Sequence, residues 1–447
     1  MFTDENISAI STAPMTAGVA VIRISGPDPL KIAKKMFACK TPTEEFEPYK
    51  MYVGNILAGP ITDFGMCVYF KAPRSYTGED MIEFHCHGGI AITRAILKKT
   101  FELGCRPATR GEFTKRAFMN GKLSLSSAEG LIDMINAESD QNAKAGYYLY
   151  REKLFNEIKK QQNDLKYVLA LIDANVDYPE EDIENAEIED VRTRLKGVSD
   201  SIKSLMSRYD GSVKIKNGVK VVICGKPNAG KSSILNSVLG QDKAIVTDVA
   251  GTTRDIVEGE RDIDGVRFCF YDTAGIRESE DKVESIGIDR SRKAIDNADV
   301  IVFIADAVSG FTEEDEKIYS AIKDRKPITV LNKTDVTKEC RLPYRSDISV
   351  SAKTGEGVRE LIDEIYARSQ VSAVVADEEY LTEERHYLAL KDALYSIEKT
   401  LSALEKDPLD ILAINVDAAW KALGLITGET VSEAVIDEIF SKFCVGK

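Results

Sequence analysis

The sequence GKPNAGKS at residues 225–232 is a glycine-rich phosphate-binding loop, and four further motifs follow it in a fixed order. These motifs are GTTRD at 251–255, DTAG at 272–275, NKTD at 332–335 and SAK at 351–353. A single match to such a loop is a weak signal, but five in this order within one domain length predict a guanine-nucleotide site. We therefore expect the chain to bind and hydrolyse GTP.

Short apolar runs rich in β-branched residues alternate with amphipathic stretches around these motifs. This alternation predicts buried parallel strands in a doubly wound α/β sheet. Asp264-Gly265 lies between two such runs and is a hairpin signal, so one edge strand is expected to be antiparallel. The expected strands are Lys220–Cys224, Val266–Tyr271, Val300–Ala305, Ile328–Asn332 and Ile348–Ser351.

Apolar residues recur with helical spacing on both sides of this domain. They step by three and four from Ile188 to Leu205, and again from Tyr387 to Leu404. Each apolar face must pack against another apolar surface, and the obvious one is the helix on the other side of the α/β domain. The α/β domain is therefore predicted to be inserted into an all-α domain, with joints at 210–212 and near 372–377.

The segment before the helices contains Gly and Pro turns and is expected to form a mixed α+β domain. Capping boxes of Ser126 with Glu129 and of Thr430 with Glu433 predict the starts of the first and last helices of the all-α domain. The predicted domains are 1–120, the discontinuous 121–215 with 375–447, and 216–374.

The bulk composition of the 447 residues is that of a globular protein, with 43% hydrophobic and 30% charged residues. We find no membrane-length apolar run, no signal peptide and no C-x-x-C pair among the eight cysteines, which suits a cytoplasmic location. A net charge of −14 gives no global attraction to nucleic acid, although local basic patches could still bind RNA.

The phosphate loop has a role for each of its residue types. Gly225 and Gly230 allow backbone amides to point at phosphate oxygens. Lys231 reaches the β- and γ-phosphates, and Ser232 offers a hydroxyl to Mg²⁺. We expect GTP and Mg²⁺ as ligands of this loop.

The NKTD motif selects the base. A carboxylate at Asp335 can accept hydrogen bonds from both the ring N–H and the exocyclic amine of guanine, a donor pair that adenine lacks. Asn332 is expected to support this residue and Lys333 to pack along the base. The backbone of Ser351, Ala352 and Lys353 would complete the base pocket.

The sequence lacks the glutamine that commonly assists GTP hydrolysis. Asp272 is expected to hold Mg²⁺ through water and the Gly275 amide to sense the γ-phosphate, but the next residue is Ile276. Ras-like enzymes use a glutamine there to orient the attacking water, which an aliphatic side chain cannot do. The candidates are a cation in place of an arginine finger, and an acid at Glu280, Asp281 or Glu284.

The combination of GKPNAGKSS, DVAGTTRD, an aliphatic residue after DTAG and a C-terminal FCVGK resembles the MnmE (TrmE) family of tRNA-modification GTPases. VIRISG at 21–26, SYTGEDMIEFHCHGG at 75–89 and GEFTKRAFMNGKLSL at 111–125 are similar to segments of that family. The terminal Cys-x-Gly-Lys is its most specific mark. Arg110 is a departure, because the family usually has Pro there, and its loss loosens the turn.

The resemblance implies an N-terminal domain that binds tetrahydrofolate and dimerises, a helical domain, and an inserted G domain whose copies meet transiently. It implies a flavoprotein partner, MnmG. Together the two proteins would add an aminomethyl or carboxymethylaminomethyl group to C5 of the tRNA wobble uridine. The one-carbon donor would be 5,10-methylene- or 5-formyl-tetrahydrofolate.

The resemblance also implies roles for individual residues. K⁺ would be bound by Asn228, Thr247, Val249 and Thr252, Mg²⁺ by Ser232 and Thr253, and folate by Arg23, Glu83, Lys122 and Lys447. The expected catalytic residues are Glu284, Asp272, Lys231 and Cys444, the last with a packing role equally open. The full expected GTP-binding set is Asn228, Ala229, Gly230, Lys231, Ser232, Ser233, Thr247, Thr252, Thr253, Asp272, Thr273, Ala274, Gly275, Asn332, Lys333, Asp335, Ser351, Ala352 and Lys353.

Two other functions fit part of the sequence. A regulatory GTPase of ribosome assembly shares the loop and the aliphatic residue, but such proteins usually carry a basic RNA-binding domain that this chain lacks. A septin- or dynamin-like GTPase would need filament surfaces, for which the C-terminus is too short. His85-Cys86-His87 looks like a metal cluster, but on a strand the Cys faces away from both His, so packing is expected.

Overall fold

The structure is a computed structural model that describes residues 5–177, 185–240, 259–272, 293–337, 346–404, 406 and 408–447. Internal contacts divide the chain into two compact units. Unit one comprises Met1–Ile132, Leu149–Leu195 and Tyr395–Lys447, and unit two comprises Asp133–Tyr148 and Lys196–Leu394. None of the described helices is both long and apolar enough to cross a membrane. The three domain boundaries expected from the sequence remain predictions.

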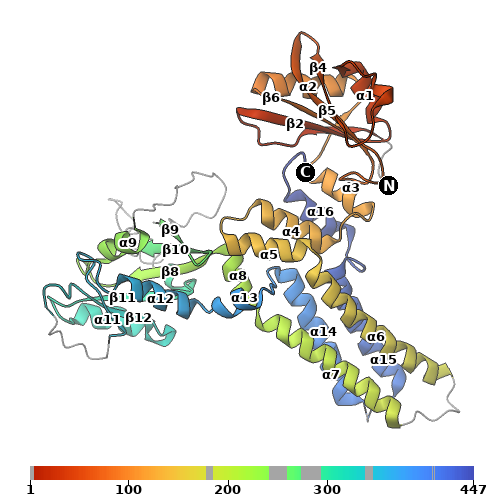
Figure 1. Cartoon of the computed structure of the whole chain (residues 1–447). Helices are drawn as coiled ribbons and strands as arrows, with labels where there is room; N and C mark the ends of the chain where they lie inside the picture. Colours follow the sequence, from red (N-terminus) through yellow and green to blue (C-terminus); the bar gives the residue numbers. More distant parts are fainter. Residues whose placement is uncertain are drawn as a thin grey trace, which may run out of the picture. The chain divides into compact units, whose positions relative to one another are not determined.

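Unit one begins with a seven-stranded sheet in the order β3-β4-β5-β6-β2-β1-β7 (Figure 1). All its pairings are antiparallel except that of β1 with β7. The helices α1 (Pro29–Met36) and α2 (Ile90–Glu102) pack their apolar residues into the core of this sheet. The strands are β1 (Ile7–Ile10), β2 (Ala17–Gly26), β3 (Phe37–Ala38), β4 (Met51–Ala58), β5 (Ile61–Phe70), β6 (Asp80–Gly88) and β7 (Arg106–Pro107). The expected α+β fold is confirmed.

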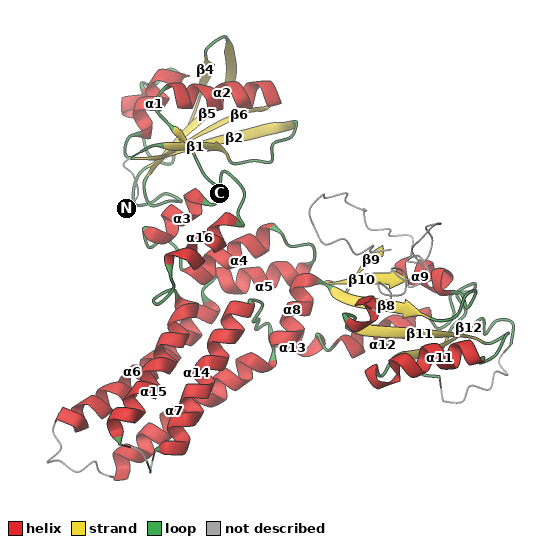
Figure 2. Cartoon of the chain, turned by 180° about the vertical axis from the view of Figure 1, so that it is seen from behind, coloured by secondary structure: helices red, strands yellow, loops and turns green. Residues whose placement is uncertain are grey.

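Besides α1 and α2, four described helices lie wholly in unit one, and they follow the sheet in sequence. They are α3 (Glu112–Met119), α6 (Lys153–Asp177), α15 (Leu409–Thr427) and α16 (Glu433–Ser441). The long helices α6 and α15 run side by side (Figures 1 and 2). Phe440 of α16 is buried together with Leu125 and Ala128 of α4 (Leu125–Ile135), so the C-terminal helix is packed.

Unit two contains the predicted doubly wound sheet. Its six strands have the order β13-β12-β11-β8-β10-β9, and every pairing is parallel except β9 with β10. The strands are β8 (Val219–Cys224), β9 (Gly259–Ile263), β10 (Val266–Asp272), β11 (Val300–Asp306), β12 (Ile328–Asn332) and β13 (Ile348–Ser349). Figure 2 shows them flanked by α9 (Lys231–Leu239), α11 (Glu313–Ile322) and α12 (Val358–Ser369).

The antiparallel edge arises where the sequence predicts it. Asp264 and Gly265 both have positive φ, 52° and 78°. Two residues with positive φ form the turn whose twist matches that of the flanking strands, and Asp-Gly is a favoured pair for it. The predicted hairpin is confirmed.

The two apolar seams form α7 (Asn185–Ser207) and α14 (Glu384–Ala403), whose ends pass into both units. Within unit two the two flanks meet, as expected. The rings of Tyr209 and Tyr387 stack with centroids 4.2 Å apart, and Leu381 N donates to Ser212 Oγ at 3.0 Å.

Both segments predicted as joints are helical. Residues 210–212 lie inside α8 (Tyr209–Asn217), and 372–377 form α13 (Ser372–Asp377). A Cβ on Gly211 would lie 2.7 Å from Val374 Cγ2. This glycine therefore allows α8 and α13 to approach closely and does not mark a turn.

Both predicted capping boxes are wrong by two residues. Ser124 caps α4, because its Oγ accepts from Ser127 N at 3.1 Å, and Ser126 is buried inside the helix. Ser432 precedes α16 as its cap, whereas Thr430 Oγ1 donates to Lys421 O. In each case a serine two residues from the predicted residue occupies the cap position, and Ser432 does so without a side-chain capping hydrogen bond.

Candidate functional site

The phosphate loop joins β8 to α9 at the carboxyl edge of the parallel sheet. Gly225 has φ 153° and a Cβ there would lie 2.4 Å from Ile304 O. Gly230 has φ 92°, and a Cβ there would lie 2.2 Å from Asn332 Nδ2. Both positions therefore require glycine, the first for close contact with β11 and the second for contact with the base-selecting motif.

The side chains expected around the phosphates converge on this loop. The Lys231 ammonium donates to the carbonyl oxygens of Gly225 and Lys226, each at 3.0 Å. Ser232 Oγ donates to Asp272 Oδ2 at 3.2 Å. A hydroxyl and a carboxylate side by side are the donor types that Mg²⁺ prefers, so these residues fit that ion.

Asn332 connects the loop to the base pocket. Its Nδ2 donates to Ala229 O at 3.0 Å, and its Oδ1 accepts from Ala352 N at 3.3 Å. The residue is 2% exposed. Because both ends of this buried amide are used, it fixes the spacing between the phosphate loop and the SAK segment.

Asp335 and Ser351 are also joined. Ser351 Oγ donates to Asp335 Oδ1 at 2.8 Å and accepts from Thr354 N at 3.2 Å. This hydrogen bond orients the carboxylate that is expected to read guanine. Ser233 in the first turn of α9 and Lys353 are exposed beside this region.

Lys333 is anchored to a residue that sequence reasoning missed. Its ammonium donates to Asn228 O at 2.9 Å and to Asp306 Oδ2 at 2.7 Å. Burial opposes ionisation of Asp306, but hydrogen bonds from Lys333 and the Val308 amide hold its pKa below the usual range. The signal that could have identified Asp306 is its position directly after the predicted strand Val300–Ala305, at the carboxyl edge of the sheet.

A buried ion pair behind the loop was missed as well. Lys226 Nζ lies 2.7 Å from Asp315 Oδ2, and the two side chains are 9% and 0% exposed. Asp315 also accepts from Thr312 N and Oγ1 in the capping box of α11. The pair therefore connects the phosphate loop to the start of α11.

Several predicted residues lie outside the described part of the chain. They are Thr247, Val249, Thr252, Thr253, Thr273, Ala274, Gly275 and Glu284, together with the alternatives Glu280 and Asp281. Of the residues expected to bind K⁺, the structure describes Asn228, which has φ 60°.

A second cluster of predicted residues lies in unit one. Arg23 of β2 pairs in register with Glu83 of β6, and Arg23 Nε donates to Glu83 Oε1 at 2.8 Å. The guanidinium carbon lies 5.0 Å from the centroid of the Tyr76 ring. Burial disfavours the Glu83 carboxylate, but the contact with His85 and the charge of Arg23 together lower its pKa.

The C-terminal tail is bound to the same region of unit one. Val445 forms an antiparallel bridge with Arg110, the residue that departs from the family pattern. Gly446 has φ 100°, and a Cβ there would lie 2.2 Å from Ile10 O. Burial and the like charge of Arg23 lower the pKa of Lys447.

The other predicted residues of this cluster have different surroundings. The Lys122 ammonium donates to Pro73 O at 3.0 Å, and Cys444 is exposed with its carbonyl accepting from Gly111 N. The two histidines each face a different acid. His85 Nε2 lies 3.4 Å from Glu83 Oε2, and His87 Nδ1 lies 2.7 Å from Asp63 Oδ1.

Two families match the chain. Residues 6–122 match the GTP-binding protein TrmE N-terminus, and residues 125–444 match the MnmE helical domain. A tRNA modification GTPase MnmE of Fervidobacterium nodosum is 41% identical and covers 99% of this chain and 98% of its own length. Proteins of the same name from Acetivibrio thermocellus and Clostridioides difficile are each 39% identical, with 100% coverage of both chains.

Among solved structures, Aquifex aeolicus Era bound to GDP·AlF₄⁻ is 33% identical over 33% of this chain and 56% of that one, at a TM-score of 0.28. The full-length relatives decide the assignment, because they span both sheets, the helices between them and the C-terminal tail. This chain belongs to the MnmE family of tRNA modification GTPases.

Proposed function

We propose that this protein is a K⁺-activated GTPase that acts with a flavoprotein of the MnmG type on the wobble uridine of tRNA. The reaction adds an aminomethyl or carboxymethylaminomethyl group to C5, and a tetrahydrofolate derivative donates the carbon. The cytoplasm is the proposed location, where this substrate is found. The family assignment supports GTP hydrolysis and tRNA modification, and the cluster around Arg23 supports the folate chemistry.

In the G domain, Lys231 would bind the β- and γ-phosphates and Asp335 would read guanine. Ser232 and Thr253 would ligate Mg²⁺, with Asp272 acting through water. Asn228 would hold K⁺, which supplies positive charge where an arginine finger acts in other GTPases. We propose Glu284 as the residue that orients the attacking water, because Ile276 cannot.

In unit one, the single observation that carries the folate proposal is the fit of the tail beside Arg23 and Glu83. Gly446 packs on Ile10 of β1, and the neighbouring Ala9 pairs in register with Arg23. The terminal Lys447 therefore adds a second cation to the region of Arg23 and its partner Glu83, and an anionic glutamate tail would balance this charge. The ionised Glu83 can accept hydrogen bonds from the amino and ring N–H groups of a pterin. Bound folate supplies the one-carbon unit, and these residues orient it.

We also propose a homodimer through the N-terminal domain. The outer face of β4 and β5 exposes large apolar side chains: Met51 is 49% exposed, Val53 56% and Phe64 62%. Contiguous apolar surface of this kind is typical of interfaces. Phe64→Glu should shift the mass measured by light scattering toward the monomer, whereas Tyr395→Glu on α14 should not. An unchanged mass for Phe64→Glu would exclude this face.

The proposed reaction is tested by reconstitution. Purified protein, the flavoprotein, unmodified tRNA, GTP and ¹³C-labelled methylene-tetrahydrofolate should yield label at C5 of the wobble uridine. Omission of K⁺ or of folate should abolish the product. Label that appears without folate, or in no condition, would contradict the proposed chemistry.

A further inference from the structure

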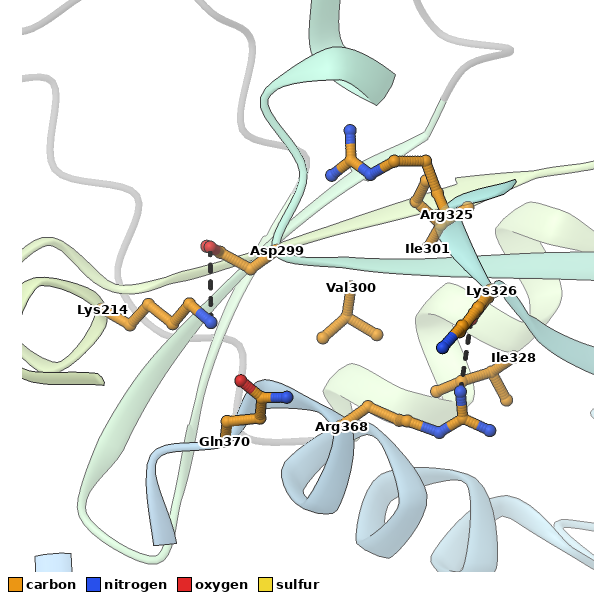
Figure 3. Close-up of a pocket in the computed structure, with 9 residues that line it drawn as sticks. All are labelled: Lys214, Asp299, Val300, Ile301, Arg325, Lys326, Ile328, Arg368 and Gln370. Atoms are coloured by element: carbon orange, nitrogen blue, oxygen red, sulfur yellow. Dashed lines mark hydrogen bonds and ion pairs between the residues drawn. The ribbon is translucent and has the colours of Figure 1, made fainter. Parts of the chain in front are cut away.

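A cavity of about 220 Å³ lies at the amino edge of the unit-two sheet (Figure 3). Its floor includes Val300 and Ile328, which are the first residues of β11 and β12. The last residues of the same strands, Asp306 and Asn332, contact the nucleotide motifs. Because these strands are parallel, the cavity and the nucleotide site lie at opposite edges of the sheet.

The cavity is basic although the chain is acidic. Four of its lining side chains are cations, and Asp299 is the one acid among those that line it. The cations are Lys214, Arg325, Lys326 and Arg368. They come from three places in the sequence: α8, the η3 turn (Lys323–Arg325) with the residue after it, and the end of α12. In a chain of net charge −14, this concentration of positive charge calls for an explanation.

Part of this positive charge has a structural role, because cations stabilise the C-terminal ends of helices. Arg325 donates to the carbonyl oxygens of Ile295, Asp296 and Ala298. Lys214 donates to Ser369 O at 3.0 Å. Peptide carbonyls orient these groups but do not neutralise their charge.

Carboxylates compensate only some of this charge. Asp299 Oδ1 is 4.0 Å from Lys214 Nζ, and its Oδ2 accepts from Lys220 N at 2.9 Å. Arg368 Nε donates to Glu364 at 2.7 Å. Lys326 is exposed, and no side-chain contact of its ammonium is found within the described ranges. An excess of positive charge therefore faces the cavity.

We propose that this cavity binds one phosphate group. The volume equals that of roughly seven water molecules at ~30 Å³ each, below the range of about 300–1,000 Å³ for sites of drug-sized ligands. A single oxyanion fits this volume. The source is a phosphodiester of the tRNA backbone or a free phosphate ion, and the tRNA source alone rests on the function proposed above.

Lys326→Glu tests the proposal, with Lys323→Glu as a matched control. Both lysines are exposed and three residues apart, and both changes alter the charge equally, but Lys323 does not line the cavity. Neither residue belongs to the GTP site, so GTP hydrolysis without tRNA should remain at the wild-type rate in both variants. A normal thermal unfolding curve would verify that each variant folds.

The tRNA arm measures affinity by fluorescence anisotropy between 50 and 200 mM KCl, with GDP and Mg²⁺ present to fill the nucleotide site. Lys326→Glu should weaken binding about tenfold and reduce the slope of log K against log salt by about one, as expected for one lost phosphate contact. Lys323→Glu should change neither quantity by more than about twofold.

The phosphate arm measures the unfolding temperature with 20 mM phosphate or chloride at equal ionic strength, again with GDP and Mg²⁺. Stabilisation by phosphate in the wild type and in Lys323→Glu, but not in Lys326→Glu, would identify the free ion as the ligand. Equal behaviour of both variants in both arms would overturn the proposal. Neither arm requires wobble-uridine modification, so the two proposals can fail separately.

Discussion

Gly446→Ala tests whether the C-terminal tail forms part of the folate site. The new Cβ would lie 2.2 Å from the backbone oxygen of Ile10, and the residue has φ 100°. A backbone oxygen cannot move aside as a flexible side chain can. An unfavourable φ alone costs about 1–3 kcal/mol, so the tail should leave its position.

The expected loss follows from what the tail contributes. Displacement removes the Lys447 ammonium, and a hydrogen bond to a charged group contributes about 1.5–3 kcal/mol, which corresponds to roughly 10- to 150-fold in affinity. Calorimetry with 5-formyl-tetrahydrofolate should show this weakening. GTP hydrolysis should remain intact, while wobble-uridine modification in the reconstituted system should be lost.

Gly104→Ala is the matched control. Gly104 has φ 105°, close to that of Gly446, but a Cβ there meets nothing within 4 Å. It therefore has the same backbone cost without the clash. Wild-type folate affinity and modification in Gly446→Ala would show that the tail is no part of the folate site.

Three further predictions concern the other sites. Hydrolysis of GTP should be much faster in K⁺ than in Na⁺. The variant Asn228→Gly, in which glycine tolerates the φ of 60°, should hydrolyse GTP at the same rate in both salts. Equal rates of the wild type in the two salts would exclude activation by K⁺. Glu83→Ala should abolish the heat of folate binding, and Glu83→Gln should show little more heat, because glutamine lacks the negative charge. Wild-type folate binding by either variant would refute the contact between Glu83 and the pterin. Burial and the nearby Glu383 carboxylate, offset by Lys216, raise the pKa of Asp133 to about 7. The native state then binds an extra proton between about pH 4 and 7, so stability should fall as the pH rises through this window. Asp133→Asn should flatten this dependence in thermal unfolding, and an unchanged profile would contradict it.

The fold of the G domain could be predicted because local signals coincide with global ones. Apolar runs such as Ile328–Asn332 are buried strands, and Asp264-Gly265 forms the turn that its residue types favour. The phosphate loop and base motif are also short stretches with fixed internal geometry. Asn332, expected to support the base pocket, contacts both the phosphate loop and the SAK segment.

The structural features that could not be predicted depend on packing between segments that are far apart in the sequence. Lys226 and Asp315 are far apart in the sequence and read as ordinary surface charges, yet they form a buried pair. Gly211 reads as a linker glycine, but it lets two helices approach. Ser124 and Ser126 are equally good caps in isolation, but Ser124 forms the cap and Ser126 is buried inside the helix.

The central claim is that this chain modifies the wobble uridine of tRNA in a folate-dependent reaction. The most direct test is mass spectrometry of wobble nucleosides in tRNA from cells that lack the protein and carry either the wild-type gene or Glu83→Ala. The account predicts unmodified C5 in the deletion strain, full restoration by the wild type and little by the variant. Normal modification at C5 in the deletion strain would contradict it.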